Sequence, residues 1–457
     1  MADAGTSSPP TAPAVPPAPA ASYSFDDAPL NRFHLKVTAL TFGANFSDGY
    51  QLGVIGIALT LMAPQMGLGA VWQGMLGASA LIGIFIGSIA LGWLADRIGR
   101  QKLYTLNFAL ITVASVAQIW VNGPGLLFVL RVLIGVGIGA DYAIGPTLVA
   151  EFCPRRHRGF LLASLTALWT IGYICSFFLG HYITGFGGDS WRWLLGTGAI
   201  PAAVVLVLRI GTPESPRWLV SKGRIEEARA VVARYIGPNV DFESVRGNAP
   251  SETSSSSGSS GSYRDLFSRE QWRATTFGIL YYNCQVIPYF AIYTFLPVVL
   301  AKFAIGESVT VDGLLNGFLF IGSVIGLWCV ARFSRRAFVT GSFIVMALAL
   351  GPMGLWPGGP KLLLFGLFLL FTLVMSASSN LDQVYPPELF PTPLRGSGVG
   401  LLNGLSRVGS AAGTFLLPLS IDHLGFATSM TILAAFLVLG AVVSAAWAPE
   451  TSGMALD

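Results

Sequence analysis

Five ionisable side chains fall inside long apolar stretches of this sequence, where charges are rare: Asp48, Arg131, Asp141, Asp382 and Arg407. A charged group in the middle of a lipid bilayer is costly, so each is a candidate for a solute or proton pathway. A buried acid can hold and release a proton, and a guanidinium matches a carboxylate with two parallel hydrogen bonds. These residue types therefore indicate the movement of protons and anions.

Polar neighbours share helix faces with two of these residues. Asp48 and Gln51 are three residues apart, and Asn403 and Arg407 are four apart. Both spacings place side chains on one side of a helix. Asp141 follows Arg131 by ten residues, which is about 15 Å along a helix. We therefore expect several polar positions at different depths of one pathway.

Membrane helices must position these side chains. Of 457 residues, 53% are hydrophobic and 11% are charged, whereas a soluble protein carries about 25% charged residues. About 20 apolar residues cross a bilayer. We expect spans at 37–64, 74–95, 103–121, 125–151, 159–184, 191–211, 273–302, 309–331, 337–357, 361–386, 396–419 and 424–448.

The spans form two sets of six around a polar connection. We expect a disordered tail at 1–35, bundles at 36–211 and 273–450, a linker at 212–272 and a tail at 451–457. The linker should hold a short helix at 223–233 and a flexible Ser/Gly-rich stretch at 251–262. The predicted fold class is an all-α polytopic membrane protein with twelve transmembrane helices in two pseudo-symmetric six-helix bundles.

Charge in the loops predicts the orientation of the chain. Basic residues gather on one side and are sparse on the other, where only Arg192, Lys302 and Lys361 are found. This bias places both termini and the linker in the cytoplasm. It also explains the net charge of +4 without nucleic acid. The crowded side carries Arg97, Arg100, Lys102, Arg155, Arg156, Arg158, Arg332, Arg335, Arg336 and Arg395.

Several classes of function find no support in the sequence. The four cysteines lie in or beside spans without an obvious pairing, and we expect neither disulfides nor metal ligands. There is no metal-ligand spacing, nucleophile motif or pair of catalytic carboxylates, so we expect no enzyme and no cofactor. The expected partners are a small solute, protons and the lipid bilayer, and nothing requires more than a monomer.

The loop after the second span carries the most specific motif, Gly92-Trp-Leu-Ala-Asp96-Arg97-Ile-Gly99-Arg100. It resembles the signature loop of the major facilitator superfamily, whose members carry solutes through two six-helix halves. Gly99 permits a tight turn, and the charges suit a latch between helix ends. The matching loop of the second half keeps Arg332 but has lost its acid. We expect these residues to take part in gating.

Further stretches resemble the sugar-porter branch of that superfamily, and the resemblance covers about residues 37–451. They are Glu151-Phe-Cys-Pro-Arg-Arg, Pro-Glu214-Ser-Pro-Arg217-Trp-Leu, Pro-Glu388-Leu-Phe-Pro with Arg395, and Pro-Glu450-Thr. The resemblance implies that these acids and arginines form the gating network on the inner side. Asp382 either joins this network or lines the inner cavity, and we assign it to gating.

The seventh span departs from the sugar-porter pattern. Gln285 is kept, but Phe290 replaces an asparagine, and Gln383 replaces the usual tryptophan before the acid of the tenth span. A sugar needs many polar partners because an unmatched buried hydroxyl is costly. Within the seventh span, the exchange of polar partners for rings favours a flatter, partly apolar solute. Lipid-facing or packing aromatics are the alternative interpretation.

The charged residues resemble other branches. Asp48 is similar to the acid of aromatic-acid and phosphate symporters, Arg131 to the arginine that partners it, and Asp141 to a residue of phosphate and organic-ion carriers. Arg407 is similar to an arginine that faces the anion in organic-anion carriers. We assign proton coupling to Asp48, Arg131 and Asp141. Predicted substrate contacts are Gln51, Tyr142, Gln285, Tyr289, Tyr293, Gln383, Asn403 and Arg407.

The hypothesis is proton-coupled movement of a small organic anion, such as an aromatic or heteroaromatic carboxylate, across the cell inner membrane by a multi-pass carrier. A sugar or polyol porter, coupled or uncoupled, is the main alternative, and a transporter-like sensor is another. Asp48 can instead be a structural acid, and Arg407 can instead belong to the gate. Substrate identity and direction of transport stay open because import and export share this fold.

Overall fold

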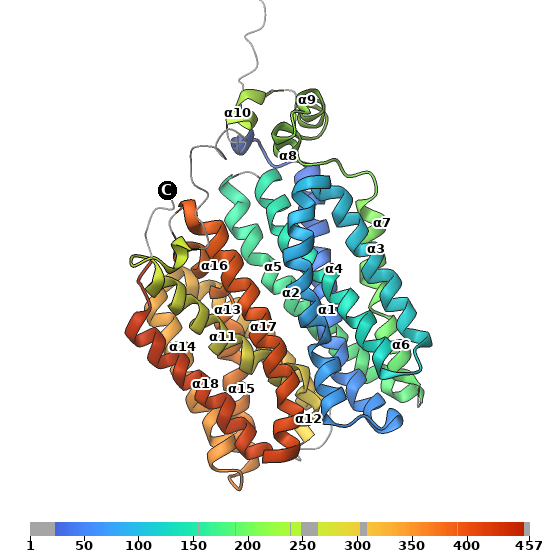
Figure 1. Cartoon of the computed structure of the whole chain (residues 1–457), viewed down its shortest axis with the longest axis vertical. Helices are drawn as coiled ribbons and strands as arrows, with labels where there is room; N and C mark the ends of the chain where they lie inside the picture. The colour runs from blue at the N-terminus through green and yellow to red at the C-terminus, as the bar shows by residue number, and fades with distance from the viewer. Residues whose placement is uncertain are drawn as a thin grey trace, which may run out of the picture.

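The structure is a computed structural model that describes residues 23–153, 155–187, 189–237, 239–247, 264–301, 309–390 and 392–451. Helices dominate it, and they gather into two bundles that lie side by side beneath a small linker region (Figure 1). Each of the twelve expected spans coincides with one helix or with two consecutive helices. The predicted fold class is confirmed.

The N-terminal half contains seven helices that fill six spans. Five of these spans each consist of one α-helix, and the sixth span is broken at Thr197 and Gly198. The helices are α1 (Arg32–Met66), α2 (Ala70–Ile98), α3 (Arg100–Ala117), α4 (Pro124–Phe152), α5 (Arg155–Ile183), α6 (Ser190–Gly196) and α7 (Ala199–Arg209). Short 3-10 turns, η2 (Gln118–Trp120) and η3 (Thr184–Phe186), extend α3 and α5.

The C-terminal half repeats this plan with two broken spans. One break lies at Phe295 and the other at Ser379 and Asn380. The helices are α11 (Trp272–Thr294), α12 (Leu296–Ala301), α13 (Val309–Arg332), α14 (Arg335–Leu355), α15 (Lys361–Ser378), α16 (Leu381–Glu388), α17 (Thr392–Leu424) and α18 (Phe426–Trp447).

The linker region sits at one end of the N-terminal half. Its helices are α8 (Pro216–Ser221), α9 (Ile225–Val231) and α10 (Phe242–Gly247), with a π turn at Val232–Ile236. After the gap, the 3-10 turn η6 (Asp265–Phe267) packs against the C-terminal half, where the Thr275 hydroxyl of α11 donates to the Leu266 carbonyl at 2.6 Å. The strand β1 (Tyr23–Ser24) pairs in parallel with β2 (Val240–Asp241), and η1 (Phe25–Asp27) follows β1. We call this end of the molecule the linker side.

Part of the expected N-terminal tail is structured. The first helix begins at Arg32, and the Asn31 side chain accepts hydrogen bonds from the backbone of Phe33 and His34 at 2.9 and 3.0 Å. The same amide donates to the carbonyls of Tyr235 and Ile236 at 2.8 and 3.0 Å. Residues 23–35, which we expected in the tail, therefore pack against the linker region, while 1–22 and the Ser/Gly-rich stretch lie outside the described residues.

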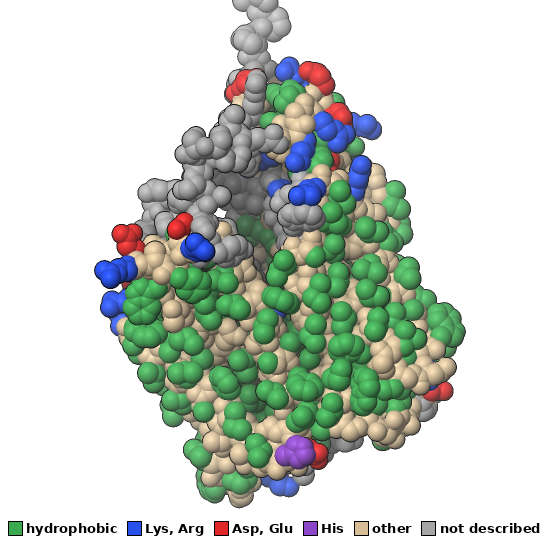
Figure 2. Space-filling view, viewed as in Figure 1, with side chains coloured by type: hydrophobic (Ala, Val, Ile, Leu, Met, Phe, Trp, Pro, Cys, Tyr) green, Lys and Arg blue, Asp and Glu red, His purple; other side chains and the backbone are tan. Residues whose placement is uncertain are grey.

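The flanks of both bundles are apolar. Nine helical segments in the described part of the chain are long and apolar enough to cross a membrane. Large exposed hydrophobic side chains, such as Val113, Leu348 and Leu362, occur on both halves. In Figure 2 green side chains cover most of the two bundles, whereas charged side chains gather near the linker region. This distribution fits a lipid-facing belt.

Small residues allow the helices of the N-terminal half to pack closely. A methyl group on Gly135 of α4 would lie 2.1 Å from the Ala80 carbonyl oxygen of α2. One on Gly139 would lie 2.4 Å from the Ile84 carbonyl. Such backbone contact is typical of membrane helices, and it brings Arg131 and Asp141 into the core of this half.

The two halves touch each other at the side opposite the linker. The Tyr173 hydroxyl of α5 donates to the Tyr293 carbonyl of α11 at 2.8 Å. A methyl group on Gly74 of α2 would lie 2.3 Å from the Phe415 carbonyl oxygen of α17. In Figure 1 the ends of α1 and α12 also adjoin there. The halves are thus closely packed at this end.

Candidate functional site

Asp48 and Asp141 form a buried acid pair between α1 and α4. Both side chains are 0% exposed, the two carboxyl groups are close enough to interact electrostatically, and none of their four oxygens has a hydrogen-bond partner among the described residues. Ionised carboxylates only accept hydrogen bonds, so a bond between the two would require a shared proton. The sequence singled out both acids, and the structure brings them together.

Arg131 does not contact this pair in the way that the resemblance implied. Its guanidinium Nη2 donates to the backbone carbonyl of Gln51 at 3.1 Å. Among the described residues no ion pair joins Arg131 to Asp48. The expected charge partnership is replaced by a contact between a guanidinium and a backbone oxygen one turn away.

Gln51 is a structural contact of the N-terminal half and lies away from the cavity described below. It is 0% exposed, and its amide nitrogen donates to the Ser115 hydroxyl at 2.7 Å and to the Gly198 carbonyl at 2.9 Å. Gly198 lies at the break between α6 and α7, where carbonyls lose their helical partners. The structure therefore does not bring Gln51 to the predicted substrate position.

A cavity of about 90 Å³ lies between the two halves. Trp169 of α5 and Tyr289 and Phe290 of α11 form its aromatic wall. Apart from Val286, the rest of the lining is polar and comes from Thr166, Thr170, Gln285, Ser376, Ser379 and Asp382. The aromatic wall continues toward the side opposite the linker. There the ring centre of Tyr293 lies 4.7 Å from that of Tyr289. Tyr289 and Tyr293 are thus placed together, as predicted contacts of one solute should be.

Arg407 on α17 lies among these rings. Its guanidinium carbon is 5.2 Å from the ring centre of Tyr142 in one half and 5.6 Å from that of Phe290 in the other. Both are within the range of cation–π attraction. The Trp169 indole N–H donates to the Tyr142 hydroxyl at 3.0 Å, which fixes that ring. A cation is therefore held beside an aromatic cavity at the junction of the halves.

Asp382 lies in the cavity wall, in the first turn of α16. The Tyr281 hydroxyl donates to its carboxylate at 2.9 Å. With its amide turned to suit its neighbours, Gln285 donates to the same oxygen at 3.1 Å and accepts from the Ser379 N–H at 3.3 Å. That N–H also donates to the Met375 carbonyl at 3.1 Å, at the end of α15. Of the two positions considered for Asp382, the structure shows the cavity.

Asn403 stands next to this acid. Its amide oxygen accepts a hydrogen bond from the Tyr282 hydroxyl at 3.2 Å, and the same hydroxyl lies 2.9 Å from the Asp382 carbonyl. Asn403 and Arg407 share a face of α17, as their spacing predicted. The structure thus gathers Tyr142, Gln285, Tyr289, Tyr293, Asn403 and Arg407 around one region.

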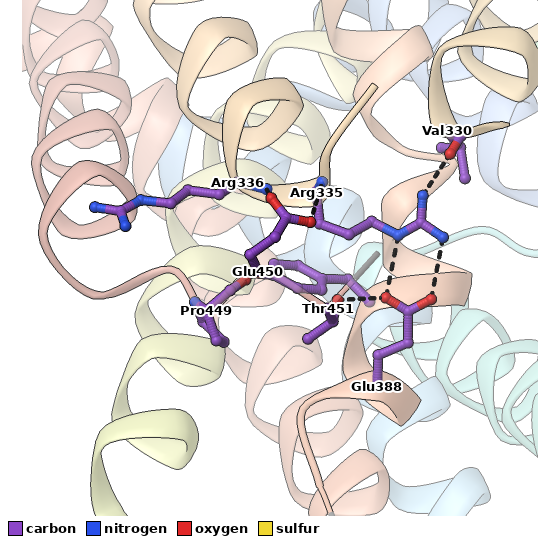
Figure 3. Close-up of polar contacts among 8 residues, drawn as sticks. Val330, Arg335, Arg336, Glu388, Pro449, Glu450 and Thr451 are labelled. Carbon is purple, nitrogen blue, oxygen red and sulfur yellow. Dashed lines mark hydrogen bonds and ion pairs between the residues drawn. The ribbon is translucent and has the colours of Figure 1, made fainter. Parts of the chain in front are cut away.

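An ion pair on the linker side fastens the C-terminal half (Figure 3). Arg335, at the start of α14, meets Glu388 of α16 with two hydrogen bonds of 3.1 Å each. The Thr451 hydroxyl donates to the same carboxylate at 2.6 Å. Arg335 also donates to the Val330 carbonyl. Glu388, one of the predicted gating residues, therefore holds helices of one half together through Arg335.

Two glutamates cap equivalent helices of the two halves. Glu450 accepts from the N–H groups of Arg335 and Arg336 at 3.0 and 3.2 Å, at the start of α14. Glu214 accepts from the N–H of Gln101 at 3.2 and 3.1 Å, at the start of α3. Acids at helix N-termini are stabilising. The repeated Pro-Glu-Ser/Thr stretches thus cap the N-terminus of the equivalent helix in each half.

Other predicted gating residues are described only in part. The side chains of Gly92, Asp96, Glu151 and Arg395, and that of the predicted substrate contact Gln383, lie outside the described part of the structure. Gly99 adopts a positive φ of 108°, as the turn before α3 requires. A methyl group there would lie 2.6 Å from the Glu214 carboxylate. Gating by all these residues stays a prediction.

The sequence analysis missed several residues that the structure places at these sites. Trp169, Tyr281 and Tyr104 carry no charge or motif that marks them. Arg209 did carry a signal, because it lies inside the expected span 191–211 and is 2% exposed. The rule that singled out Arg131 applies equally to it.

Comparisons with known proteins agree on one group of carriers. Residues 36–457 match the family model described as sugar (and other) transporter. The inner membrane metabolite transport protein YgcS of Escherichia coli is 44% identical, with 94% of this chain and 95% of that protein covered. YaaU of the same organism, a putative metabolite transport protein, is 36% identical over 95% and 96%.

More distant proteins extend this range. A partially occluded inward open structure of the xylose transporter XylE from E. coli matches with a TM-score of 0.78 at 19% identity, over 93% of this chain and 100% of that one. The 4-hydroxybenzoate transporter PcaK and the niacin transporter NiaP of Acinetobacter baylyi are 25% and 24% identical, over 92% and 94% of this chain and 91% and 98% of theirs. These relatives are all transport proteins, but the solutes in their names differ.

Proposed function

The chain belongs to the sugar (and other) transporter family of the major facilitator superfamily, and we propose that it carries a small organic anion, an aromatic or heteroaromatic carboxylate, in symport with protons. The family makes it a multi-pass membrane transporter. The solute class and the coupling are the proposal. They rest on the two groups of residues described above.

The observation that carries the proposal is the position of Arg407 beside the cavity. A guanidinium held 5.2 and 5.6 Å from two rings offers its N–H groups to a carboxylate. The rings of Trp169, Tyr289 and Phe290 offer flat apolar surface to the rest of such a solute. A benzoate-like molecule has both features, a carboxylate and a ring.

The buried acid pair supports coupling to protons. Asp48 and Asp141 have no described contact with the cavity, so they act on solute transport indirectly. A pair of carboxyls that can hold one proton or release it changes the charge inside the N-terminal half by one unit. Because charge in a low-dielectric interior is costly, the two protonation states favour different packings of the halves. Protonation then biases the alternation of access.

Alternating access follows from the arrangement of the halves. They are closely packed at the side opposite the linker, through Tyr173 and Tyr293 and through Gly74 and Phe415. In our proposal the linker side is cytoplasmic, with both termini, because the basic loops lie there. The halves rock about the cavity, which opens to one side at a time.

Relatives are consistent with the proposed solute. PcaK is named as a 4-hydroxybenzoate transporter and NiaP as a niacin transporter, and both solutes are aromatic acids. At 25% and 24% identity these names support the class without assigning a molecule.

A sugar or polyol is the second candidate solute. The cavity also presents Thr166, Thr170, Gln285, Ser376 and Ser379, which can bind hydroxyl groups. The family model and the structural resemblance to a xylose transporter favour it. It leaves Arg407 without a function in binding, which is why we place it second.

Uptake into proteoliposomes tests the proposal. Labelled 4-hydroxybenzoate, nicotinate, glucose and xylose are offered with and without an imposed proton gradient. We expect one of the acids to accumulate only with the gradient. Asp48→Asn should abolish the accumulation, and Arg407→Met should raise KM for the acid at least tenfold, since a charged hydrogen bond contributes about 1.5–3 kcal/mol.

Matched variants separate these effects from damage to the fold. Arg192→Met removes a guanidinium that lies 4.5 Å from the Trp191 ring near the side opposite the linker, and should leave KM unchanged. Accumulation of glucose or xylose in place of the acids would refute the solute class. Normal accumulation of an acid by Asp48→Asn would refute the coupling site.

A further inference from the structure

Arg209, the last residue of α7, is a charge that the proposed mechanism has not yet used. Its side chain is 2% exposed. Its Nε and Nη2 atoms have no hydrogen-bond partner among the described residues. Its guanidinium carbon lies 3.2 Å from the centre of the Tyr104 ring on α3. A buried guanidinium needs a negative charge nearby, because an unpaired one is costly.

That negative charge is the acid pair. Tyr104 lies between Arg209 and Asp141, and Arg209 and Asp141 are close enough to interact electrostatically. The Tyr104 hydroxyl faces the Asp141 carboxyl, since a methyl group on Gly145 would lie 3.1 Å from Asp141 Oδ1 and 3.2 Å from the hydroxyl. Both oxygen atoms therefore converge over the same glycine.

The residues of this cluster lie in a row that crosses four helices. It runs from Asp48 on α1 to Asp141 on α4, Tyr104 on α3 and Arg209 on α7. Among the described residues, Tyr142 of α4 also lies within electrostatic reach of both acids, and the Arg131 guanidinium of α4 binds the Gln51 carbonyl, one turn from Asp48. Two arginines thus accompany two acids, so a proton added to the acid pair leaves an excess positive charge in this core.

Arg209 also ties the cluster to the linker side. Its carbonyl accepts a hydrogen bond from the Gln101 side chain at 3.2 Å. The N–H of Gln101 is in turn bound by Glu214, next to the turn at Gly99. The end of α7 is therefore joined to the start of α3 and to the signature loop. A shift of that loop during the rocking motion moves Arg209 relative to Asp141.

We propose that Arg209, stacked on Tyr104, is a positioning residue that drives release of the proton from the Asp48–Asp141 pair on the linker side. This inference rests on the proposed function, because it requires that the pair carries the coupled proton. An arginine keeps its own proton, so Arg209 acts as a fixed charge that favours ionised Asp141. The Tyr104 hydroxyl donates to the carboxylate that forms, and the released proton passes to water.

The first test titrates the acids without any solute. Infrared difference spectra of the purified full-length protein follow the C=O stretch of protonated carboxylic acids as the pH changes. The band of the pair is identified by its loss in Asp48→Asn and Asp141→Asn. In Arg209→Met the midpoint of this band should move at least one pH unit upward, because the acids hold their proton more tightly.

Two further variants keep the test decisive. Tyr104→Phe removes one oxygen atom and should shift the midpoint upward by a smaller amount. Arg209→Lys keeps the charge and should stay closer to wild type than Arg209→Met does. Arg192→Met, which removes another ring-stacked guanidinium from the same half, should leave the midpoint in place. Should Arg209→Met fail to fold, Tyr104→Phe and Arg209→Lys still give the answer.

Transport of labelled 4-hydroxybenzoate provides the second readout. Exchange between equal pools of solute does not require release of the proton, whereas net accumulation does. Arg209→Met should keep exchange within about twofold of wild type and lose net accumulation at least tenfold. A merely structural role would lower both together.

The outcomes distinguish this inference from the proposed function. If wild type shows no titrating band that the Asp48 and Asp141 variants lose, the proton site itself is wrong. If that band exists but keeps its midpoint in Arg209→Met and Tyr104→Phe, only the role of Arg209 is overturned.

Discussion

Asp382 lies within electrostatic reach of the Arg407 guanidinium, in the wall of the same cavity. An ionised carboxylate there competes with the carboxylate of a solute for the Arg407 guanidinium. Asp382→Asn keeps the shape and removes the charge. We expect KM for 4-hydroxybenzoate to fall about fivefold or more, because two charges about 4 Å apart interact by at least about 1 kcal/mol even in water.

Initial rates of uptake over a range of solute concentrations measure this change. Asp189→Asn removes an acid whose side chain is 76% exposed at the start of α6, and should leave KM as in wild type. A rise in KM for Asp382→Asn would mean that its hydrogen bonds with Tyr281 and Gln285 shape the cavity more than its charge opposes the anion.

At the scale of single residues, the sequence identified the unusual residues well. It did not identify which of them contact each other. Asp48 and Asp141 stand out because acids are rare in apolar stretches, but nothing local indicates that they face each other. The expected partnership of Arg131 with Asp48 came from a resemblance. In the structure the Arg131 Nη2 atom binds the Gln51 carbonyl, and its Nε and Nη1 atoms have no hydrogen-bond partner among the described residues. Contacts between distant helices depend on packing that a single sequence does not display.

The helices themselves follow from composition. Long apolar stretches give each of the twelve spans, because no other backbone structure satisfies its hydrogen bonds in lipid apart from a closed barrel. The breaks at Thr197 and Gly198 and at Ser379 and Asn380 were not predicted. At the first of these breaks the Gln51 side chain, from another helix, binds the Gly198 carbonyl. Such partners come from elsewhere in the chain, so local patterns carry little trace of them.

The contact between α2 and α17 yields a prediction about the conformational equilibrium. A methyl group on Gly74 would lie 2.3 Å from the Phe415 carbonyl oxygen. Overpacking costs about 1–3 kcal/mol, which changes an equilibrium constant about five- to 150-fold. Gly74→Ala should therefore disfavour closure at this end and slow transport. Faster hydrogen–deuterium exchange in peptides around residues 68–77 would report the opening.

Gly317→Ala on α13 is the matched control, because a methyl group there meets no atom within 4 Å. It should leave exchange and transport unchanged. Equal behaviour of the two variants would show that the close approach at Gly74 does not limit closure.

In the molecule as a whole, the linker region belongs mechanically to the N-terminal half. The Phe25 N–H donates to the Ser244 hydroxyl at 2.9 Å, and the Arg217 guanidinium lies 5.5 Å from the Phe25 ring. Asn31 completes the attachment by capping α1 and binding two linker carbonyls. The N-terminal segment, the linker helices and α1 thus form one unit.

Asn31→Ala should loosen that unit. Loss of the cap and of two hydrogen bonds should lower the free energy of unfolding by about 1–3 kcal/mol. Thermal unfolding of the detergent-solubilised protein measures it. Asn122→Ala, which removes an exposed amide whose oxygen lies 3.3 Å from Arg192, should change it by about 0.5 kcal/mol or less. Equal melting temperatures for the two variants would contradict the proposed attachment.

The attachment of the N-terminal segment through β1 and β2 has a practical consequence for measuring motion. A spectroscopic label on residues 23–31 or on α9 reports the position of the first half alone. A second label can be placed near Arg335 or Glu388, which are bound to each other within the second half. The distance between the two labels then serves as a molecular ruler. The distribution of distances along that ruler would count the populations of the carrier's states one molecule at a time, with no need to know its cargo.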